Sequence, residues 1–182
     1  MRHRLQPVTP DDREVLLAVY ANTRADELAL TDWSAAQRLA FVEMQFDAQL
    51  QHYAQQRPQA VCQLIVLADG PAGGPMDGPT GGSIGGRAVD RLWVDRDAES
   101  LHVLGITLLP QARGQGQGSV LLRELMAEAQ QRCTQLTVSV EIHNRARRLY
   151  ERLGFEAQGG LQGIYQRMAW QPATLLQLEH QE

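Results

Sequence analysis

The clearest chemical feature of this chain is a glycine-rich segment at 113–119 with the sequence RGQGQGS. An apolar run that predicts a buried strand precedes it, and an amphipathic run that predicts a helix follows it. Because glycine lacks a Cβ, backbone N–H groups in such a segment can converge on a ligand. The start of the helix adds N–H donors without intrahelical partners and the positive end of the helix dipole. The segment therefore predicts a site for a polyanion such as a pyrophosphate.

Two side chains of the segment would add to this site. Ser119 offers a hydroxyl, and Arg113 offers either a charge or a brace for the loop. The spacing Gly-x-Gly-x-Gly differs from the dinucleotide-binding pattern Gly-x-Gly-x-x-Gly. All 17 basic residues are Arg, which excludes a Walker-type phosphate loop and a Schiff-base lysine. A turn without a ligand is the alternative interpretation of the segment by itself.

The composition narrows the classes of protein to which the chain can belong. A length of 182 residues, 43% of them hydrophobic, fits one domain with its own core. The net charge of −4 does not favour nucleic acid or an anionic membrane as a partner. Neither a signal peptide nor a membrane-length apolar run is visible, and Cys62 and Cys133 are interpreted as buried thiols. We therefore expect a soluble cytoplasmic protein without a metal site.

Hydrophobic periodicity and capping signals divide the chain into helices and strands. We expect helices at about 9–25, 34–57, 120–133 and 144–153. We expect strands at about 4–8, 61–69, 88–95, 101–109, 136–142, 155–160 and 163–170. From residue 83 onward the order is strand, strand, helix, strand, helix, strand, strand. This order predicts an α+β fold with a mixed, mostly antiparallel sheet.

Residues 70–86 differ in composition from the rest of the chain. They hold eight of the 16 glycines and three of the eight prolines. This predicts a flexible surface loop between two antiparallel strands, with a lid over a binding site as the alternative. We expect one domain at 1–170 that includes this loop, followed by a C-terminal tail at 171–182.

A second motif, NRARRLYERLGF at 144–155, follows the strand expected at 136–142. Taken together, this motif and the glycine-rich segment closely resemble the GNAT superfamily of N-acetyltransferases. The cofactor loop of that family, Arg/Gln-x-x-Gly-x-Gly/Ala, is matched by Arg113, Gly116 and Gly118. Its later motif is matched by Asn144, Ala146, Leu149, Tyr150, Glu151, Leu153, Gly154 and Phe155. The resemblance is strong across about 83–170.

The resemblance implies a GNAT-like central sheet with splayed central strands and helices on both faces. It also implies acetyl-CoA as the acyl donor, with its pantetheine between the strands at 101–109 and 136–142. Backbone groups of the first strand and N–H groups of the glycine-rich segment would hold it. The implied cofactor-binding residues are Ile106, Thr107, Leu108, Arg113, Gly114, Gln115, Gly116, Gln117, Gly118, Ser119, Asn144 and Tyr150.

The same resemblance suggests residues for the chemistry. Tyr150 matches the family's general acid, which protonates the departing thiolate; packing on the inner face of its helix is the alternative. The general base is open between a chain of waters and the side chains of Glu141, His102 and Glu99. Gly105 stands in mid-strand where family members often carry a side chain. A base could be absent at that point, or Gly105 could permit a β-bulge that aims a backbone donor.

Acceptor specificity in this family comes largely from the N-terminal helices. Trp33 is the expected wall of the acceptor pocket. The nearby acids Asp26, Glu27 and Asp32 would suit a cationic acceptor, and a solvated surface explains them equally well. The expected activity is transfer of an acetyl group to a primary amine, of a small molecule or a protein, by direct attack in a ternary complex. The alternatives are another acyl group or a non-catalytic acyl-CoA sensor or partner module, and a homodimer is possible.

Overall fold

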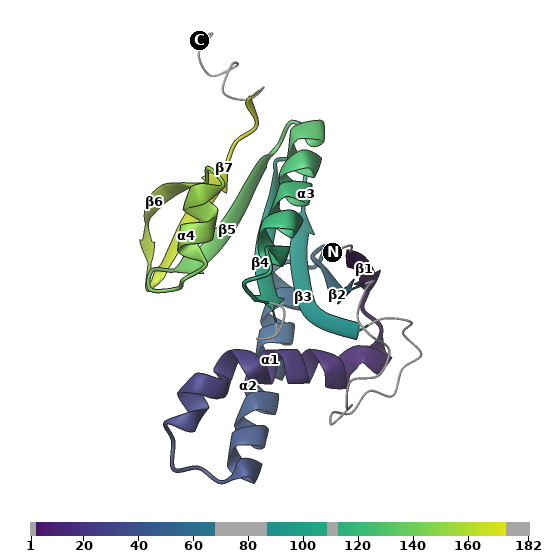
Figure 1. Ribbon diagram of the computed structural model, residues 1–182, viewed down its shortest axis with the longest axis vertical. Helices are drawn as coiled ribbons and strands as arrows, with labels where there is room; N and C mark the ends of the chain where they lie inside the picture. The colour runs from purple at the N-terminus through teal and green to yellow at the C-terminus, as the bar shows by residue number, and fades with distance from the viewer. Residues whose placement is uncertain (1–2, 68–86, 109–112, 174–182) are drawn as a thin grey trace. The chain divides into compact units, whose positions relative to one another are not determined.

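The computed structural model describes residues 3–67, 87–108 and 113–173 (Figure 1). The loop expected at 70–86 lies outside the described residues. Most of the tail expected at 171–182 also lies outside them, as does the last residue of the strand expected at 101–109.

In the described part of the chain, strands form a seven-stranded sheet in the order β1-β2-β3-β4-β5-β7-β6. The strands are β1 (His3–Pro7), β2 (Val61–Leu67), β3 (Arg87–Arg96), β4 (Ser100–Leu108), β5 (Gln135–Glu141), β6 (Glu156–Gln162) and β7 (Tyr165–Trp170). β4 and β5 pair in parallel, whereas β1 with β2, β5 with β7 and β6 with β7 pair antiparallel. The predicted α+β fold with a mixed, mostly antiparallel sheet is confirmed.

The helices follow the capping signals of the sequence. They are the 3-10 turn η1 (Pro10–Asp12) and the α-helices α1 (Arg13–Ala29), α2 (Ala35–Gln56), α3 (Gln117–Arg132) and α4 (Arg147–Arg152). At the start of α2, the N–H of Gln37 donates to Ser34 Oγ at 3.3 Å and the N–H of Ser34 donates to Gln37 Oε1 at 2.9 Å. The sequence Ser34-Ala35-Ala36-Gln37 fits a capping box, and these two hydrogen bonds form it, which satisfies backbone donors that a helix start otherwise leaves unpaired.

By its internal contacts the chain divides into two compact units. The first consists of Met1–Trp93 with Ile106–Arg113, and the second of Val94–Gly105 with Gly114–Glu182. The first unit therefore contains α1, α2, β1 and β2, and the second contains α3, α4, β5, β6 and β7.

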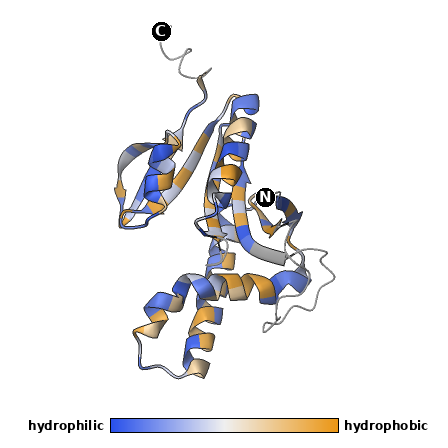
Figure 2. Cartoon of the chain, viewed as in Figure 1, coloured by the Kyte–Doolittle hydropathy of each residue, from blue (hydrophilic) through white to orange (hydrophobic). Residues whose placement is uncertain are grey.

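The core of the first unit is formed by apolar residues of α1, α2 and β2. It consists of Leu16, Tyr20, Leu28, Val42, Phe46, Leu64 and Val66. The rings of Tyr20 and Phe46 pack with their centroids 5.6 Å apart. Figure 2 shows hydrophobic and hydrophilic residues alternating along both helices, as amphipathic helices require. Burying each large side chain of this core contributes about 1.5–3 kcal/mol.

β3 differs from its sequence-based expectation. The sequence AVDRLWVD at 88–95 alternates between apolar and polar residues, which predicts a strand with one face in water, but residues 90–94 are all buried. Asp90 and Arg91 are only 0% and 4% exposed. The expectation of a half-buried strand is therefore wrong, because protein covers both faces of β3 and not only the apolar one.

The core of the second unit includes residues of α3 and β5, two elements that contact each other. The buried side chains of α3 are Leu121, Leu122, Leu125 and Ala129, and those of β5 include Leu136, Val138 and Val140. Arg96 joins the end of β3 to α3 by an ion pair with Glu128, Nε to Oε1 at 2.7 Å. α3 is thereby fixed from both its apolar and its polar side.

β4 and β5 stay paired over only part of their lengths. The parallel register runs from Ser100 opposite Gln135 to Val103 opposite Val138. Both strands continue further, β4 to Leu108 and β5 to Glu141. The register with β5 therefore ends at Val103, before the end of β4.

Two further features concern residue classes with possible functions. Cys62 is half-buried, but Cys133, which was expected to be buried, is exposed at the end of α3 with a left-handed φ of 50°. Among the described residues, no group of three or more His, Cys, Asp or Glu side chains could hold a metal ion. In the same residues, each helix is too short or too polar to cross a membrane.

Candidate active site

The glycine-rich segment forms a tight turn that leads into α3. Gly114 has φ 74° and Gly116 has φ 80°, a left-handed conformation that costs other residues about 1–2 kcal/mol. Gly116 is the N-cap of α3, and its carbonyl accepts the N–H of Val120 at 3.1 Å. A Cβ built on either glycine would meet no atom of the described residues within 4 Å, so these residues leave the space in front of both open. The turn thus presents bare backbone to an open volume.

The first turn of α3 adds backbone donors at this place. Gln117 and Gly118 are buried, whereas Gly114 and Gly116 are exposed. The first N–H groups of any α-helix have no intrahelical acceptor, and the helix dipole places partial positive charge there. Ser119, half-buried in the same turn, carries the predicted hydroxyl. This set of donors fits a phosphate or a pyrophosphate.

Arg113 and the end of β4 belong to the first unit. The Nε of Arg113 donates to the carbonyl oxygen of Leu108 at 2.8 Å. The side chain thereby links the end of β4 to the start of the glycine-rich turn, which is the bracing role considered from the sequence. Ile106, Thr107 and Leu108 are half-buried.

Tyr150 lies on α4 in the second unit and is 7% exposed. Its ring packs against Phe155, with centroids 5.5 Å apart. Burial raises the pKa of the Tyr150 phenol to about 12, because desolvation disfavours the phenolate. The side chain therefore both packs in the core and keeps its proton at neutral pH. Gly154, with φ 87°, follows the end of this helix, which the sequence predicts at residue 153.

Asn144 and Glu141 lie next to each other at the end of β5. The N–H of Asn144 donates to the carbonyl oxygen of Glu141 at 2.9 Å, and Asn144 Oδ1 accepts the N–H of Ala146 at 2.9 Å. Asn144 therefore caps the turn before α4, and α4 begins at Arg147, three residues later than expected. Glu141 is half-buried at the strand end where β4 and β5 are no longer paired.

The other two candidate bases lie elsewhere. His102 is buried, and its Nδ1 is 2.7 Å from Thr137 Oγ1 on the neighbouring strand. Thr137 stands four residues before Glu141, roughly 13 Å along β5, so His102 and Glu141 are not brought together. Glu99 is exposed in the turn after β3. In this arrangement His102 serves as a cross-strand partner inside the sheet.

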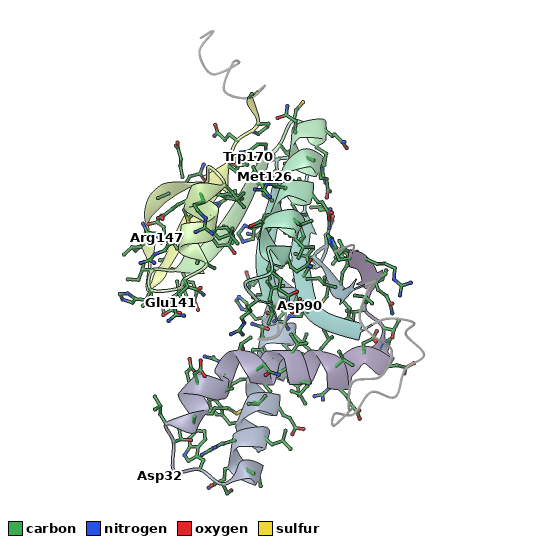
Figure 3. The ribbon with its side chains drawn as sticks, viewed as in Figure 1. Asp32, Asp90, Met126, Glu141, Arg147 and Trp170 are labelled. Atoms are coloured by element: carbon green, nitrogen blue, oxygen red, sulfur yellow. The ribbon has the colours of Figure 1, made fainter. Side chains whose placement is uncertain are left out.

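The structure also reveals a basic hollow that the sequence-based site did not include. It has a volume of about 680 Å³ and is lined by Ile142, His143, Asn144, Arg145, Arg147, Arg148 and Glu151. Figure 3 shows Arg147 on α4 and Glu141 at the end of β5. Arg147 pairs with Glu151 at 2.9 Å, and none of the ion pairs found within the described residues includes Arg145 or Arg148. The signal in the sequence is the run of arginines after Asn144, which predicts a solvated face, with contact between one arginine and a CoA phosphate as the alternative.

Trp33 lies in the first unit, directly before the cap of α2. It is 40% exposed, and its ring meets Phe41 edge-on with centroids 5.2 Å apart. Its outer surface is exposed, and its role as a wall of the acceptor pocket stays a prediction.

Comparison with known proteins gives a consistent result. A family model described as an acetyltransferase (GNAT) domain matches residues 62–157. A search of curated proteins finds no match for the chain.

Many solved structures share the fold. The PaiA N-acetyltransferase of Thermoplasma acidophilum, crystallised with coenzyme A, matches with a TM-score of 0.64 and 13% identity, covering 94% of this chain and 99% of that one. An acetyltransferase of Thermus thermophilus matches with a TM-score of 0.62 and 18% identity, covering 94% and 97%. The spermidine/spermine N-acetyltransferase SpeG of Vibrio cholerae matches with a TM-score of 0.57 and 14% identity, covering 97% and 98%. At identities this low, the matches to solved structures show the shared fold alone. The family model covers more than half of the sequence and shows that the chain belongs to the GNAT family of acetyltransferases.

Proposed function

We propose that this protein transfers an acetyl group from acetyl-CoA to a primary amine by direct attack in a ternary complex. The observation that carries the proposal is the turn at Gly114 and Gly116, which presents bare backbone to open space at the start of α3. The acceptor amine belongs to a small molecule or to a protein.

Two features of the second unit would hold the anionic parts of acetyl-CoA. The turn and the first N–H groups of α3 would bind the pyrophosphate, with Ser119 adding its hydroxyl. Arg145 and Arg148 in the basic hollow would bind the 3′-phosphate, since a guanidinium matches phosphate geometry well. Because the chain contains no Lys, each of these contacts is made by backbone, hydroxyl or Arg.

The acyl arm would lie along β4. Backbone groups of Ile106, Thr107 and Leu108 would pair with the pantetheine in the manner of an added strand. A backbone N–H of β4 would polarise the thioester carbonyl, and one such donor contributes roughly 3–4 kcal/mol to catalysis. The end of the β4–β5 ladder at Val103 supports this role, because the later part of β4 is not paired with β5.

Proton transfer completes the reaction. The acceptor must lose a proton first, because an ammonium group has a pKa near 10.4. Glu141, half-buried at the open end of β5, is the better-placed side-chain base, and a water is the alternative. As the amine nitrogen bonds to the acetyl carbon, the C–S bond breaks, its electron pair stays on sulfur, and the nitrogen gives up a second proton to water. Tyr150 Oη then gives its proton to that sulfur and regains one from water.

The proposal is tested by following thiol release from acetyl-CoA against a panel of amines, with mass spectrometry of the products. We expect acetylated product from at least one class of amine. Binding of acetyl-CoA without turnover across a broad panel would instead support the non-catalytic sensor. Propionyl-CoA and succinyl-CoA in the same assay determine which acyl group is preferred.

A further inference from the structure

Arg91 on β3 is a buried cation that has no negative partner among the described residues. Its Nη2 donates to Oε1 of Gln49 on α2 at 3.0 Å. Its Nε and Nη1 are buried and have no hydrogen-bond partner in the part of the chain that the structure describes. None of the ion pairs found among those residues includes Arg91. Two of its donor atoms are therefore unsatisfied.

The charge interactions found for Arg91 among the described residues do not supply a counter-charge. They involve Cys62, Tyr53 and Tyr20, and all three side chains are neutral when protonated. Burial raises the pKa of the Cys62 thiol to about 11, so it stays protonated at neutral pH. The Trp93 ring lies 5.6 Å from the guanidinium and offers only its π-face. A buried guanidinium stays charged and costs several kcal/mol without a partner, so this position needs a functional reason.

The hairpin between β3 and β4 indicates where Arg91 stands in the sheet. The N–H of Asp97 donates to the carbonyl oxygen of Ser100 at 3.1 Å. Regular antiparallel pairing counted back from this bond puts Arg91 opposite Ile106. Side chains of directly opposed residues share a face, with Cβ atoms about 4.5–5.5 Å apart. Arg91 therefore stands beside the start of the β4 segment that is proposed to hold the pantetheine.

We propose that Arg91 binds a carboxylate of the acceptor, so that the substrate is an amine that also carries a carboxylate group. This inference rests on the proposed function. Nη1 and Nη2 form one edge of the guanidinium and match the two oxygens of a carboxylate. The amide oxygen of Gln49 now occupies the position of one of these oxygens, and a bound carboxylate would displace it.

The surroundings suit such a group. Tyr53 and Trp93 meet edge-on, with centroids 4.6 Å apart, and form an apolar wall beside Arg91 that strengthens a charge pair. The acids that suggested a cationic acceptor are less decisive in the structure. Glu27 already pairs with Arg24 at 2.9 Å, and Asp26 and Asp32 are exposed.

The test uses amino acids, each compared with its own α-carboxamide, which keeps the amine and the size but removes the negative charge. We expect the wild-type protein to acetylate the acids with a KM at least about 10-fold lower than that of the amides. Arg91→Gln should raise KM for the acids about 10- to 100-fold, the range for losing hydrogen bonds to a charged group. KM for the amides and the affinity for acetyl-CoA should stay within about twofold.

Gln49→Glu provides a second variant at a partly exposed helix position. It gives Arg91 an internal carboxylate, which should raise KM for the acids, leave the amides unchanged and raise the unfolding temperature. Arg13→Gln is the matched control, because Arg13 on α1 forms an ion pair with Asp47 on α2 and its side chain is half-exposed. It should leave both KM values unchanged.

The outcomes separate this inference from the proposed function. Equal KM values for acids and amides that Arg91→Gln leaves unchanged would overturn the carboxylate site while acetyl transfer stands. If no amine is acetylated, the proposed function fails, and calorimetry of the same acids against the CoA-bound protein decides on Arg91. Binding that needs the carboxylate and disappears in Arg91→Gln would support the site, and the absence of such binding would overturn it.

Discussion

The rings of Tyr150 and Phe155 pack with centroids 5.5 Å apart and planes inclined at 58°. A backbone hydrogen bond from the Phe155 N–H to the Tyr150 carbonyl oxygen, at 3.0 Å, also holds the two residues together. The phenol is therefore held by core packing at the end of α4, and its hydroxyl can be removed without disturbing that packing. This makes the role of the hydroxyl separable from the role of the ring.

Tyr150→Phe should lower kcat by roughly 10²–10⁴, the usual contribution of a positioned general acid. The affinity for acetyl-CoA should stay within about twofold, because the ring and its contact with Phe155 remain. Steady-state kinetics and calorimetry check both expectations. Tyr165→Phe, at an exposed tyrosine of β7, is the control and should leave kcat unchanged. An unaltered kcat in Tyr150→Phe would mean that water protonates the thiolate.

The raised pKa of Tyr150 also predicts how stability depends on pH. The unfolded chain loses this phenolic proton near pH 10, whereas the folded protein holds it up to about 12. Between these values the native state binds more protons, so the free energy of unfolding should fall by up to about 1.4 kcal/mol per pH unit. Denaturant titrations from pH 9 to pH 12 should show a shallower fall in Tyr150→Phe than in the wild type. Identical slopes would contradict the assignment of the raised pKa.

Much of the fold is predictable because local signals decide it. The capping pair Ser34 and Gln37 fixes the start of α2, and Gly154 at positive φ fixes the end of α4. The start of α4 is less predictable. The side chain of Asn144 accepts a hydrogen bond from the N–H of Ala146. A turn therefore replaces the first three residues of the helix that the hydrophobic pattern predicted. A competing side-chain bond of this kind leaves no trace in hydrophobic periodicity.

The candidate site divides in the same way. The glycines at 114 and 116 are recognisable, because only their positive φ permits the turn. His102 was a candidate base from the sequence, and only the register with Thr137 reveals its partner inside the sheet. The burial of Arg91 could not be foreseen, since an Arg in an alternating strand normally faces water. Tertiary contacts, and not the pattern within the strand, determine which polar residues are covered.

Gly116→Val tests the phosphate-binding turn. A side chain at this glycine would fill the open space in front of the turn, and it would also strain a residue with φ 80°. We expect the affinity for acetyl-CoA to fall by about 10-fold or more through lost backbone hydrogen bonds to the anion. Stability should fall by about 1–2 kcal/mol.

Gly163→Val separates the two effects. Gly163 has φ 63° in the turn between β6 and β7, and a Cβ there also meets open space. This variant should lose similar stability and keep its affinity for acetyl-CoA. Equal affinity in the two variants by calorimetry would remove the turn from the cofactor site.

The basic hollow makes a different prediction, about the 3′-phosphate alone. Arg148 lines the hollow, whereas Arg152 lies on the same short helix, exposed and outside the lining. Arg148→Gln should weaken binding of CoA about 10-fold at low salt, and less at high salt because exposed charges are screened. It should not change binding of 3′-dephospho-CoA, which lacks the group that Arg148 would hold. Arg152→Gln should change neither affinity. If Arg148→Gln weakens both ligands equally, the hollow holds another part of the cofactor, and if it weakens neither, its arginines are a solvated face of α4.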